Sequence, residues 1–140
     1  MNYELYEKQC KKQQEENKIY LDIFEKDLIN TGLTNKTIKK HVSNVELYIN
    51  DYLLREAPLK MEEGCGSIID MFLGYFFIHK CLWSTPGTIK TTAASIKKFY
   101  KCMYEHGYVS KEDYNDLCSI IKESMELWQD ECAEFNNFDE

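Results

Sequence analysis

Apolar side chains recur at steps of three and four along most of this chain, which is the spacing of one face of an α-helix. The clearest stripe, made of Ile38, Val42, Val45, Ile49 and Leu53, predicts an amphipathic helix of about 20 residues. No stretch alternates between apolar and polar residues as a half-buried β-strand does. The pattern therefore predicts an all-α protein.

The same period predicts four further helices, over residues 3–30, 68–78, 86–106 and 111–134. The first of these is almost wholly polar between residues 7 and 18, so we expect its first turns to project or fray. The helix over 68–78 is apolar on nearly every face, which is typical of the central element of a bundle. The other two carry single apolar stripes at helical spacing.

Helix ends carry signals of their own. Gly32 and Gly107 suit the left-handed residue that closes a helix, and Thr34 and Thr85 offer hydroxyls that cap the helices after them. Capping boxes are predicted at residues 67–70 and 110–113. No linker rich in Gly, Ser or Pro divides the chain, so we expect a single helical domain over residues 1–140.

The charge is unevenly distributed. The net charge of the chain is −7, yet residues 33–111 hold eleven Lys and Arg against seven Asp and Glu, whereas residues 112–140 hold ten acidic residues and one lysine. Lys36, Lys39 and Lys40 should face solvent together at the start of the second helix. On the fourth predicted helix Lys90, Lys97 and Lys101 lie within about 40° of one another around the axis.

Two basic stripes beside hydroxyl and amide groups provide what phosphate binding requires, namely positive charge and donors near helix N-termini. The polar groups concerned are Thr34, Asn35, Thr37, Ser84, Thr85, Thr88 and Thr91. Lysines on exposed helix faces are also common as plain solvated surface, and the acidic balance of the chain disfavours nucleic acid. Charge alone therefore leaves both interpretations open.

Two stretches resemble the N-terminal core-binding domain of the tyrosine recombinase (phage integrase) family. They read FEKDLINTGLTNKTIKKHVSNVELYINDYL, over residues 24–53, and STPGTIKTTAASIKKFYKCMYEHGYVSKED, over residues 84–113. The resemblance covers about residues 20–120 and implies a SAM-like orthogonal four-helix bundle, to which the acidic segment of about residues 110–140 adds a long C-terminal helix. In that family the domain forms half of a clamp around DNA.

The resemblance also implies which residues contact DNA, through the second and fourth helices. The matching positions are Thr34, Lys36, Thr37, Lys40, His41, Thr85, Thr88, Lys90, Lys97 and Lys101. The catalytic domain of the family needs two arginines and a His-x-x-Arg motif, whereas this chain has one arginine, Arg55, and no such motif. We therefore expect a free-standing domain of a mobile element that grips duplex DNA without cutting it.

The alternative function is a protein-interaction module. The acidic C-terminal helix would then meet a basic partner, either a recombinase or a second copy of the chain, without DNA binding. Trp128, Phe135 and Phe138 would serve as aromatic anchors there, although packing against the bundle explains them as well. The aromatic residues of the rest of the chain are expected in the core.

No enzyme, metal site or cofactor is predicted. Cys102 and His106 have the i, i+4 spacing of half a zinc site, with His79 and Cys81 as conceivable partners, but a buried thiol and a histidine near a helix C-terminus explain them without metal. The six cysteines are expected to be free thiols, mostly in the core. The sequence shows no signal peptide and no apolar stretch long enough to cross a bilayer, so we expect a cytoplasmic protein.

Overall fold

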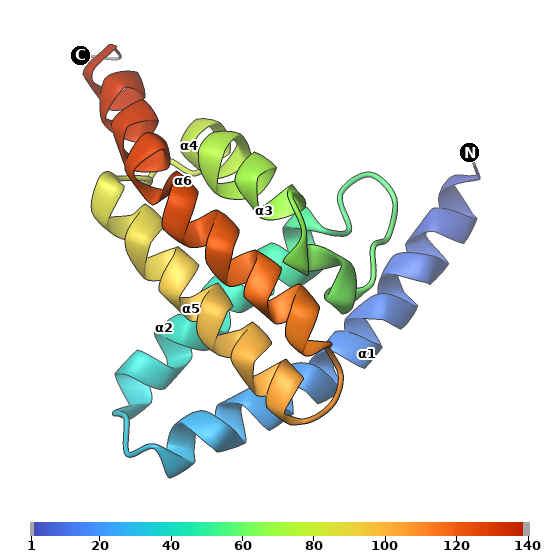
Figure 1. The fold of residues 1–140 in the computed structure, drawn as a ribbon. Coiled ribbons are helices and arrows are strands. Elements are labelled where there is room, and N and C mark those ends of the chain that lie inside the picture. The colour runs from blue at the N-terminus through green and yellow to red at the C-terminus, as the bar shows by residue number, and fades with distance from the viewer. Residues whose placement is uncertain (1, 139–140) are drawn as a thin grey trace.

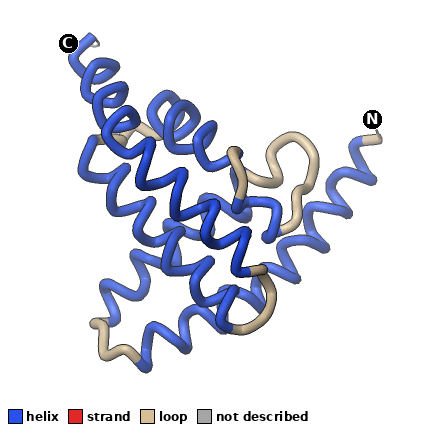
Figure 2. Tube along the Cα trace, viewed as in Figure 1, coloured by secondary structure: helices blue, strands red, loops and turns tan. Residues whose placement is uncertain are grey.

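The computed structural model describes residues 2–138 and is helical throughout, with no strand among those residues (Figure 2). The helices are α1 (Tyr3–Asn30), α2 (Asn35–Glu46), α3 (Ile68–Met71), α4 (Phe77–Lys80), α5 (Pro86–Glu105) and α6 (Lys111–Phe138). Two π-helical segments, η1 (Leu47–Tyr52) and η3 (Phe72–Phe76), extend α2 and join α3 to α4, and η2 (Met61–Cys65) is a 3₁₀ helix. The prediction of an all-α protein is confirmed.

The helices cross one another around α5. In Figure 1, α5 and α6 run side by side in opposite directions, α2 crosses behind α5, and α1 passes behind the end of α5. The short helices α3 and α4, with η3 between them, pack against the other side of α6. Since α5 contacts α1, α2 and α6, its polar face is confined to the gaps between these neighbours.

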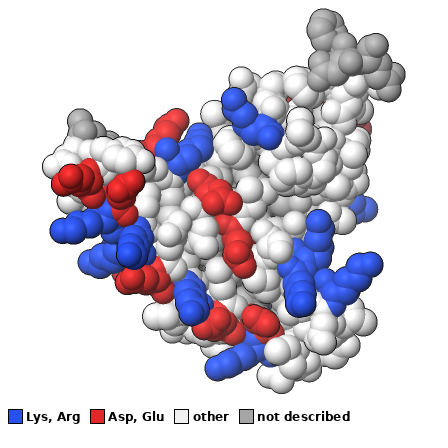
Figure 3. Space-filling view, turned by 180° about the vertical axis from the view of Figure 1, so that it is seen from behind, with Lys and Arg blue, Asp and Glu red and all other residues white. Residues whose placement is uncertain are grey.

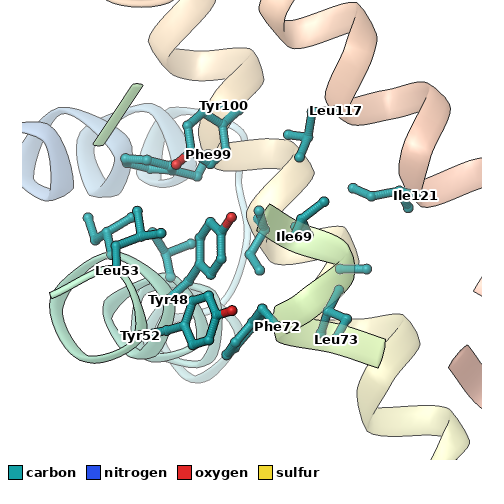
Figure 4. Packing of buried hydrophobic residues seen from close by; sticks show 14 of the residues in the cluster. Tyr48, Tyr52, Leu53, Ile69, Phe72, Leu73, Phe99, Tyr100, Leu117 and Ile121 are labelled. Carbon is teal, nitrogen blue, oxygen red and sulfur yellow. The ribbon is translucent and has the colours of Figure 1, made fainter. Parts of the chain in front are cut away.

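The core is rich in aromatic rings. Tyr48, Tyr52 and Phe72 pack together, with ring centroids 4.8 to 5.9 Å apart, and Tyr100 of α5 meets Tyr48 edge-on (Figure 4). The buried hydroxyls are paired, because Tyr48 donates to the carbonyl of Gly64 at 2.7 Å and Tyr100 donates to that of Met61 at 2.6 Å. These bonds join η2 to η1 and to α5. Each hydroxyl thereby recovers the hydrogen bond that it loses on leaving water.

The first turns of α1 do not fray, which corrects the expectation from sequence. Asn2 caps the helix, and the Tyr6 hydroxyl donates to the carbonyl of Leu54. Asn17 is fully buried and donates to the carbonyl of Ile49 at 3.2 Å and to the side chain of Asn50 at 2.8 Å. Most residues of this polar half are exposed, but the buried side chain of Asn17 pairs with the backbone of a π-helical turn and holds the half against η1.

Most predicted helix ends are confirmed. Gly32 and Gly107 have φ angles of +82° and +85° after α1 and α5, and Thr34 and Thr85 cap α2 and α5 through their hydroxyls. At the start of α6, Ser110 accepts a hydrogen bond from the backbone of residue 113 at 3.1 Å. The capping box at residues 67–70 is wrong, since the Ser67 side chain makes no cap.

The carboxylate that was expected in that box has another role. Asp70 accepts a hydrogen bond from the indole Nε1 of Trp128 at 2.6 Å, and so ties α3 to α6. Trp128 is fully buried and lies so close to Gly74 that a Cβ there would be 2.8 Å from the indole ring. Glycine at position 74 therefore makes room for the indole.

All six cysteines are free, and four of them are buried, as predicted. Within residues 2–138, no helix is long and apolar enough to cross a membrane.

Candidate nucleic-acid interface

A groove of about 720 Å³ lies between the first turns of α2 and the middle of α5. Its lining residues are Lys36, Thr37, Lys39, Lys40, His41, Ser43 and Asn44 from α2 and Thr91 and Ser95 from α5. Every charged side chain that lines it is a lysine. Seen from behind, Lys and Arg side chains gather at the lower right of Figure 3, where the first turns of α2 lie.

Local sequence explains why the lysines gather there. Thr34 caps α2 by accepting from the backbone of Thr37 at 3.3 Å, so Lys36 falls in the first turn of the helix. Ile38 turns into the core with 4% of its surface exposed, which sends Lys39 and Lys40 outward. The lysines thus surround the N-terminal end of α2, where the helix dipole adds positive potential.

The floor of the groove is a small polar network centred on Ser95. This hydroxyl belongs to a residue that is 1% exposed, lies 2.8 Å from Nδ1 of His41, accepts from Nδ2 of Asn44 at 3.0 Å, and lies 3.1 Å from the carbonyl of Thr91. These bonds hold the imidazole and amide of α2 against α5. Nε2 of His41 makes no hydrogen bond with the part of the chain that the structure describes.

His41 is half-buried at this position. Burial lowers the pKa of its imidazole below the ordinary value of 6.5, and the positive charge of Lys98 on α5 lowers it further. The ring is therefore neutral at neutral pH and carries one donor and one acceptor nitrogen. A negative charge that entered the groove would favour the protonated form.

The residues expected on α2 meet in the groove, with one exception. Lys36, Thr37, Lys40 and His41 all line it. Thr34 lies just outside, where its hydroxyl caps the helix and bonds the Thr37 hydroxyl at 3.0 Å.

The residues expected on α5 do not meet there. Thr85 and Thr88 form a reciprocal capping box, in which the Thr85 backbone donates to the Thr88 hydroxyl at 2.8 Å. Lys90 and Lys97 are exposed on a face turned about 100° from Thr91 around the helix axis. Lys101 lines a different pocket, between α1 and α5, together with two carboxylates, Asp27 and Glu105.

Lys39 and Thr91 line the groove as well; they were singled out with the basic stripes but not among the positions that the family resemblance implies. Three further lining residues, Ser43, Asn44 and Ser95, were not singled out from the sequence at all. Ser95 had a signal in the sequence, since it lies between Phe99 and Cys102 around the axis of α5, next to the apolar stripe of that helix. Polar residues on a buried face need partners, so such a residue indicates where two helices share hydrogen bonds. Asn44 had no comparable signal, because only the packing of α2 on α5 brings it to Ser95.

The acidic helix presents charge without the expected aromatic anchors. The described acidic residues of α6, all exposed, are Glu112, Asp113, Asp116, Glu123, Glu126, Asp130, Glu131 and Glu134. Trp128 packs into the bundle instead of facing a partner, and Phe135 is half-buried against His79, with ring centroids 4.5 Å apart. The Phe138 side chain lies outside the described part of the structure.

No known family model, curated protein or solved structure matches this chain.

Proposed function

We propose that this chain binds duplex DNA in the groove between α2 and α5, through ionic contacts with the phosphate backbone, and does not cleave it. The observation that carries the proposal is the convergence of three lysines, Lys36, Lys39 and Lys40, on one groove lined by hydroxyl and amide groups. Positive charge and short polar donors beside a helix N-terminus are the groups that bind phosphate in proteins.

The family resemblance supports the same site. It implies a SAM-like orthogonal four-helix bundle that presents its second and fourth helices to DNA, and the groove is formed by the helices at those positions, α2 and α5. The all-helical architecture agrees with such a bundle, to which α6 is the additional C-terminal helix. The mobile-element context belongs to the same proposal.

The proposed binding is mainly sequence-independent. Lysines that approach phosphates release condensed counterions, which favours association at low salt regardless of base sequence. Lys90 and Lys97, on the outer face of α5, would extend the positive surface to phosphates further along the duplex. Nε2 of His41 would be the polar atom of the groove that is free to meet the nucleic acid.

The proposal excludes catalysis by this chain. The only arginine of the sequence, Arg55, places its guanidinium 4.0 Å from the centre of the Tyr52 ring, where it packs on an aromatic face. A phosphoryl-transfer site of the recombinase type needs more than one arginine. Binding and cleavage are therefore separate in this proposal.

The experiment is a fluorescence anisotropy titration of a labelled random duplex with the full chain at low salt. Replacing Lys36 and Lys40 by Gln should weaken binding at least about tenfold on any sequence, since neither side chain would then neutralise a phosphate. The matched control replaces Lys8 and Lys122, which are exposed on α1 and α6, and removes the same charge. Equal affinities for the groove and control variants would refute the groove as the site.

The exposed acidic face of α6 is the observation that favours a second candidate function. Glu123, Glu126, Asp130 and Glu134 follow one another at steps of three and four, so they form one charged stripe suited to a basic protein partner. If the wild-type chain failed to bind duplex DNA at low salt, DNA binding would be refuted and the protein-interaction function of α6 would be the remaining candidate. Removing α6 would not test it, since the helix buries Leu117, Trp128 and other core residues.

A further inference from the structure

Three side chains of different chemistry meet where the last turns of α1 pass the last turns of α5. Oδ2 of Asp27 accepts a hydrogen bond from the thiol of Cys102 at 3.0 Å and lies 3.0 Å from Nε2 of His106. The carboxylate oxygen, the sulfur and a nitrogen of the imidazole all lie within 4.8 Å of one another. Sulfur, nitrogen and oxygen donors thus face a common point.

The packing of α1 on α5 places the three groups. Cys102 and His106 are four residues apart on α5 and so share a face of that helix. Phe24 and Phe99 meet edge-on about one turn earlier, with centroids 5.4 Å apart, and fix the register of the two helices. Asp27 therefore completes the half-site, in place of the sequence-suggested partners His79 and Cys81.

Those two suggested partners lie elsewhere in the fold. His79 hydrogen-bonds the carbonyl of Tyr75 at 2.8 Å and packs against Phe135 of α6. Cys81 is buried just after α4. Sequence spacing identified two of the three donors, Cys102 and His106, and only the crossing of α1 and α5 supplies the third, Asp27.

The ionisation of the cluster argues against a nucleophilic cysteine. The hydrogen bond from Cys102 lowers the pKa of the Asp27 carboxyl, burial opposes that effect, and the bond to His106 lowers it further. Burial, followed by the bond to Asp27, raises the pKa of the Cys102 thiol well above its usual value. A protonated thiol is a poor nucleophile, so the cluster is unsuited to nucleophilic catalysis by Cys102.

We propose that Asp27, Cys102 and His106 form a three-ligand site for a thiophilic divalent cation of the zinc type. Zinc takes thiolate, imidazole and carboxylate ligands at about 2.0 to 2.3 Å in tetrahedral geometry, which separates neighbouring ligand atoms by about 3.2 to 3.7 Å. The two separations of 3.0 Å from Oδ2 of Asp27 are within about 0.7 Å of these values, and the third separation, from Sγ of Cys102 to Nε2 of His106, is below 4.8 Å. Hard cations such as magnesium prefer all-oxygen sites and do not suit this donor set.

Binding is a simple exchange of ligands. The hydrated cation loses water molecules, and bonds form to Sγ of Cys102, Nε2 of His106 and Oδ2 of Asp27. The thiol proton passes to the buffer, so one proton leaves for each ion bound. The fourth position faces solvent on the side of His106, whose side chain is 42% exposed, and a water molecule completes the tetrahedron.

The site lies outside the DNA-binding groove and rests on none of the groove residues. Its consequence is structural, because the ion would join α1 to α5 across 75 residues of sequence. A ligand that binds only the folded chain raises its stability. Loss of DNA binding would therefore leave this proposal intact, and the reverse also holds.

The test uses the reduced, chelator-treated full chain titrated with Co²⁺, a spectroscopic substitute for Zn²⁺. One equivalent of Co²⁺ should produce a thiolate-to-cobalt charge-transfer band and intense visible bands of tetrahedral geometry, and one equivalent of Zn²⁺ should abolish both. The Cys102→Ser variant should lose the charge-transfer band. The His106→Asn variant, altered at an exposed position, should bind at least about tenfold more weakly.

Matched controls keep the test specific among six cysteines and three histidines. Cys118→Ser and His79→Asn should bind Co²⁺ with the wild-type spectrum and affinity, and far-ultraviolet circular dichroism verifies that each variant is helical. A wild-type chain without the charge-transfer band would overturn the proposal. So would a band that persists in Cys102→Ser or an affinity unchanged in His106→Asn.

Discussion

His41 is fixed in the groove by a hydrogen bond and is also the side chain of the groove whose pKa is shifted. Nδ1 of its ring is held by Ser95, so the ring cannot turn away from α5 without losing a hydrogen bond in a buried place. Burial and Lys98 keep the pKa of the imidazole low in the free protein. Phosphate groups in the groove would offset the charge of Lys98, and binding would then be linked to proton uptake.

Acidification should therefore strengthen DNA binding through His41. Between about pH 7.5 and about pH 6, at constant ionic strength, we expect the affinity of the wild-type chain to rise up to about fivefold more than that of a His41→Asn variant. The measurement is duplex anisotropy at each pH. A His79→Asn variant controls for the other histidines, and an equal pH response in all three proteins would exclude His41 from the site.

Burial and Lys98 hold the pKa of His41 low in the free protein, and bound phosphates would raise it, so the complex would bind more protons than the free protein between the two pKa values. Affinity consequently falls as pH rises through this window and becomes constant above it. Asp51, whose pKa is raised by burial, lies in a separate pocket between α1 and η1 and does not face the groove.

At the scale of the elements, the sequence predicts most of what the structure contains. Five helical stretches, with ends at Gly32, Thr34, Thr85 and Gly107, follow from period and capping chemistry. These signals are local, since each involves contacts within a turn or two of one helix. They are accurate because no distant residue is needed to satisfy them.

The features that sequence reasoning missed all depend on distant partners. Asp70 has the spacing of a capping box with Ser67, yet its carboxylate bonds the indole of Trp128, 58 residues away. Asn17 is polar and was expected near a frayed end, yet it bonds a π-helical turn of η1. The groove also depends on distant residues. The lysine cluster of α2 can be recognised in the sequence, whereas Ser95 forms the floor of the groove only because α5 packs against α2.

The bond between Asp70 and Trp128 should stabilise the attachment of α6 to α3. In an Asp70→Ala variant the buried indole N–H loses its acceptor, which should lower the free energy of unfolding by about 1 to 3 kcal/mol. Asp70→Asn keeps an acceptor oxygen and should lose less. Urea unfolding followed by circular dichroism measures both losses.

The control for this pair is Asp116→Ala, which removes an exposed carboxylate from α6. It should change the unfolding free energy by no more than about 0.5 kcal/mol. If Asp70→Ala lowered the free energy of unfolding no more than this control does, the hydrogen bond from Asp70 to the indole would not contribute to stability.

At the scale of the whole molecule, the sign of the net charge is misleading. The chain carries −7, but the excess of acidic over basic residues lies mainly in residues 112–140, whereas the lysines of α2 line the groove between α2 and α5. Separation of charge over the surface lets an acidic protein present a positive site to phosphates. The Debye length of about 8 Å at physiological ionic strength also limits how far the charge of α6 reaches.

The central claim is that the α2 lysines contact phosphates, and the dependence of DNA affinity on salt tests it most directly. The logarithm of affinity should fall linearly with the logarithm of salt concentration, and replacing Lys36, Lys39 and Lys40 by Gln should flatten that slope by about 0.9 for each phosphate that is no longer neutralised. A control variant with Gln at Lys8, Lys11 and Lys122 should keep the wild-type slope. Equal slopes in the two triple variants would contradict the account.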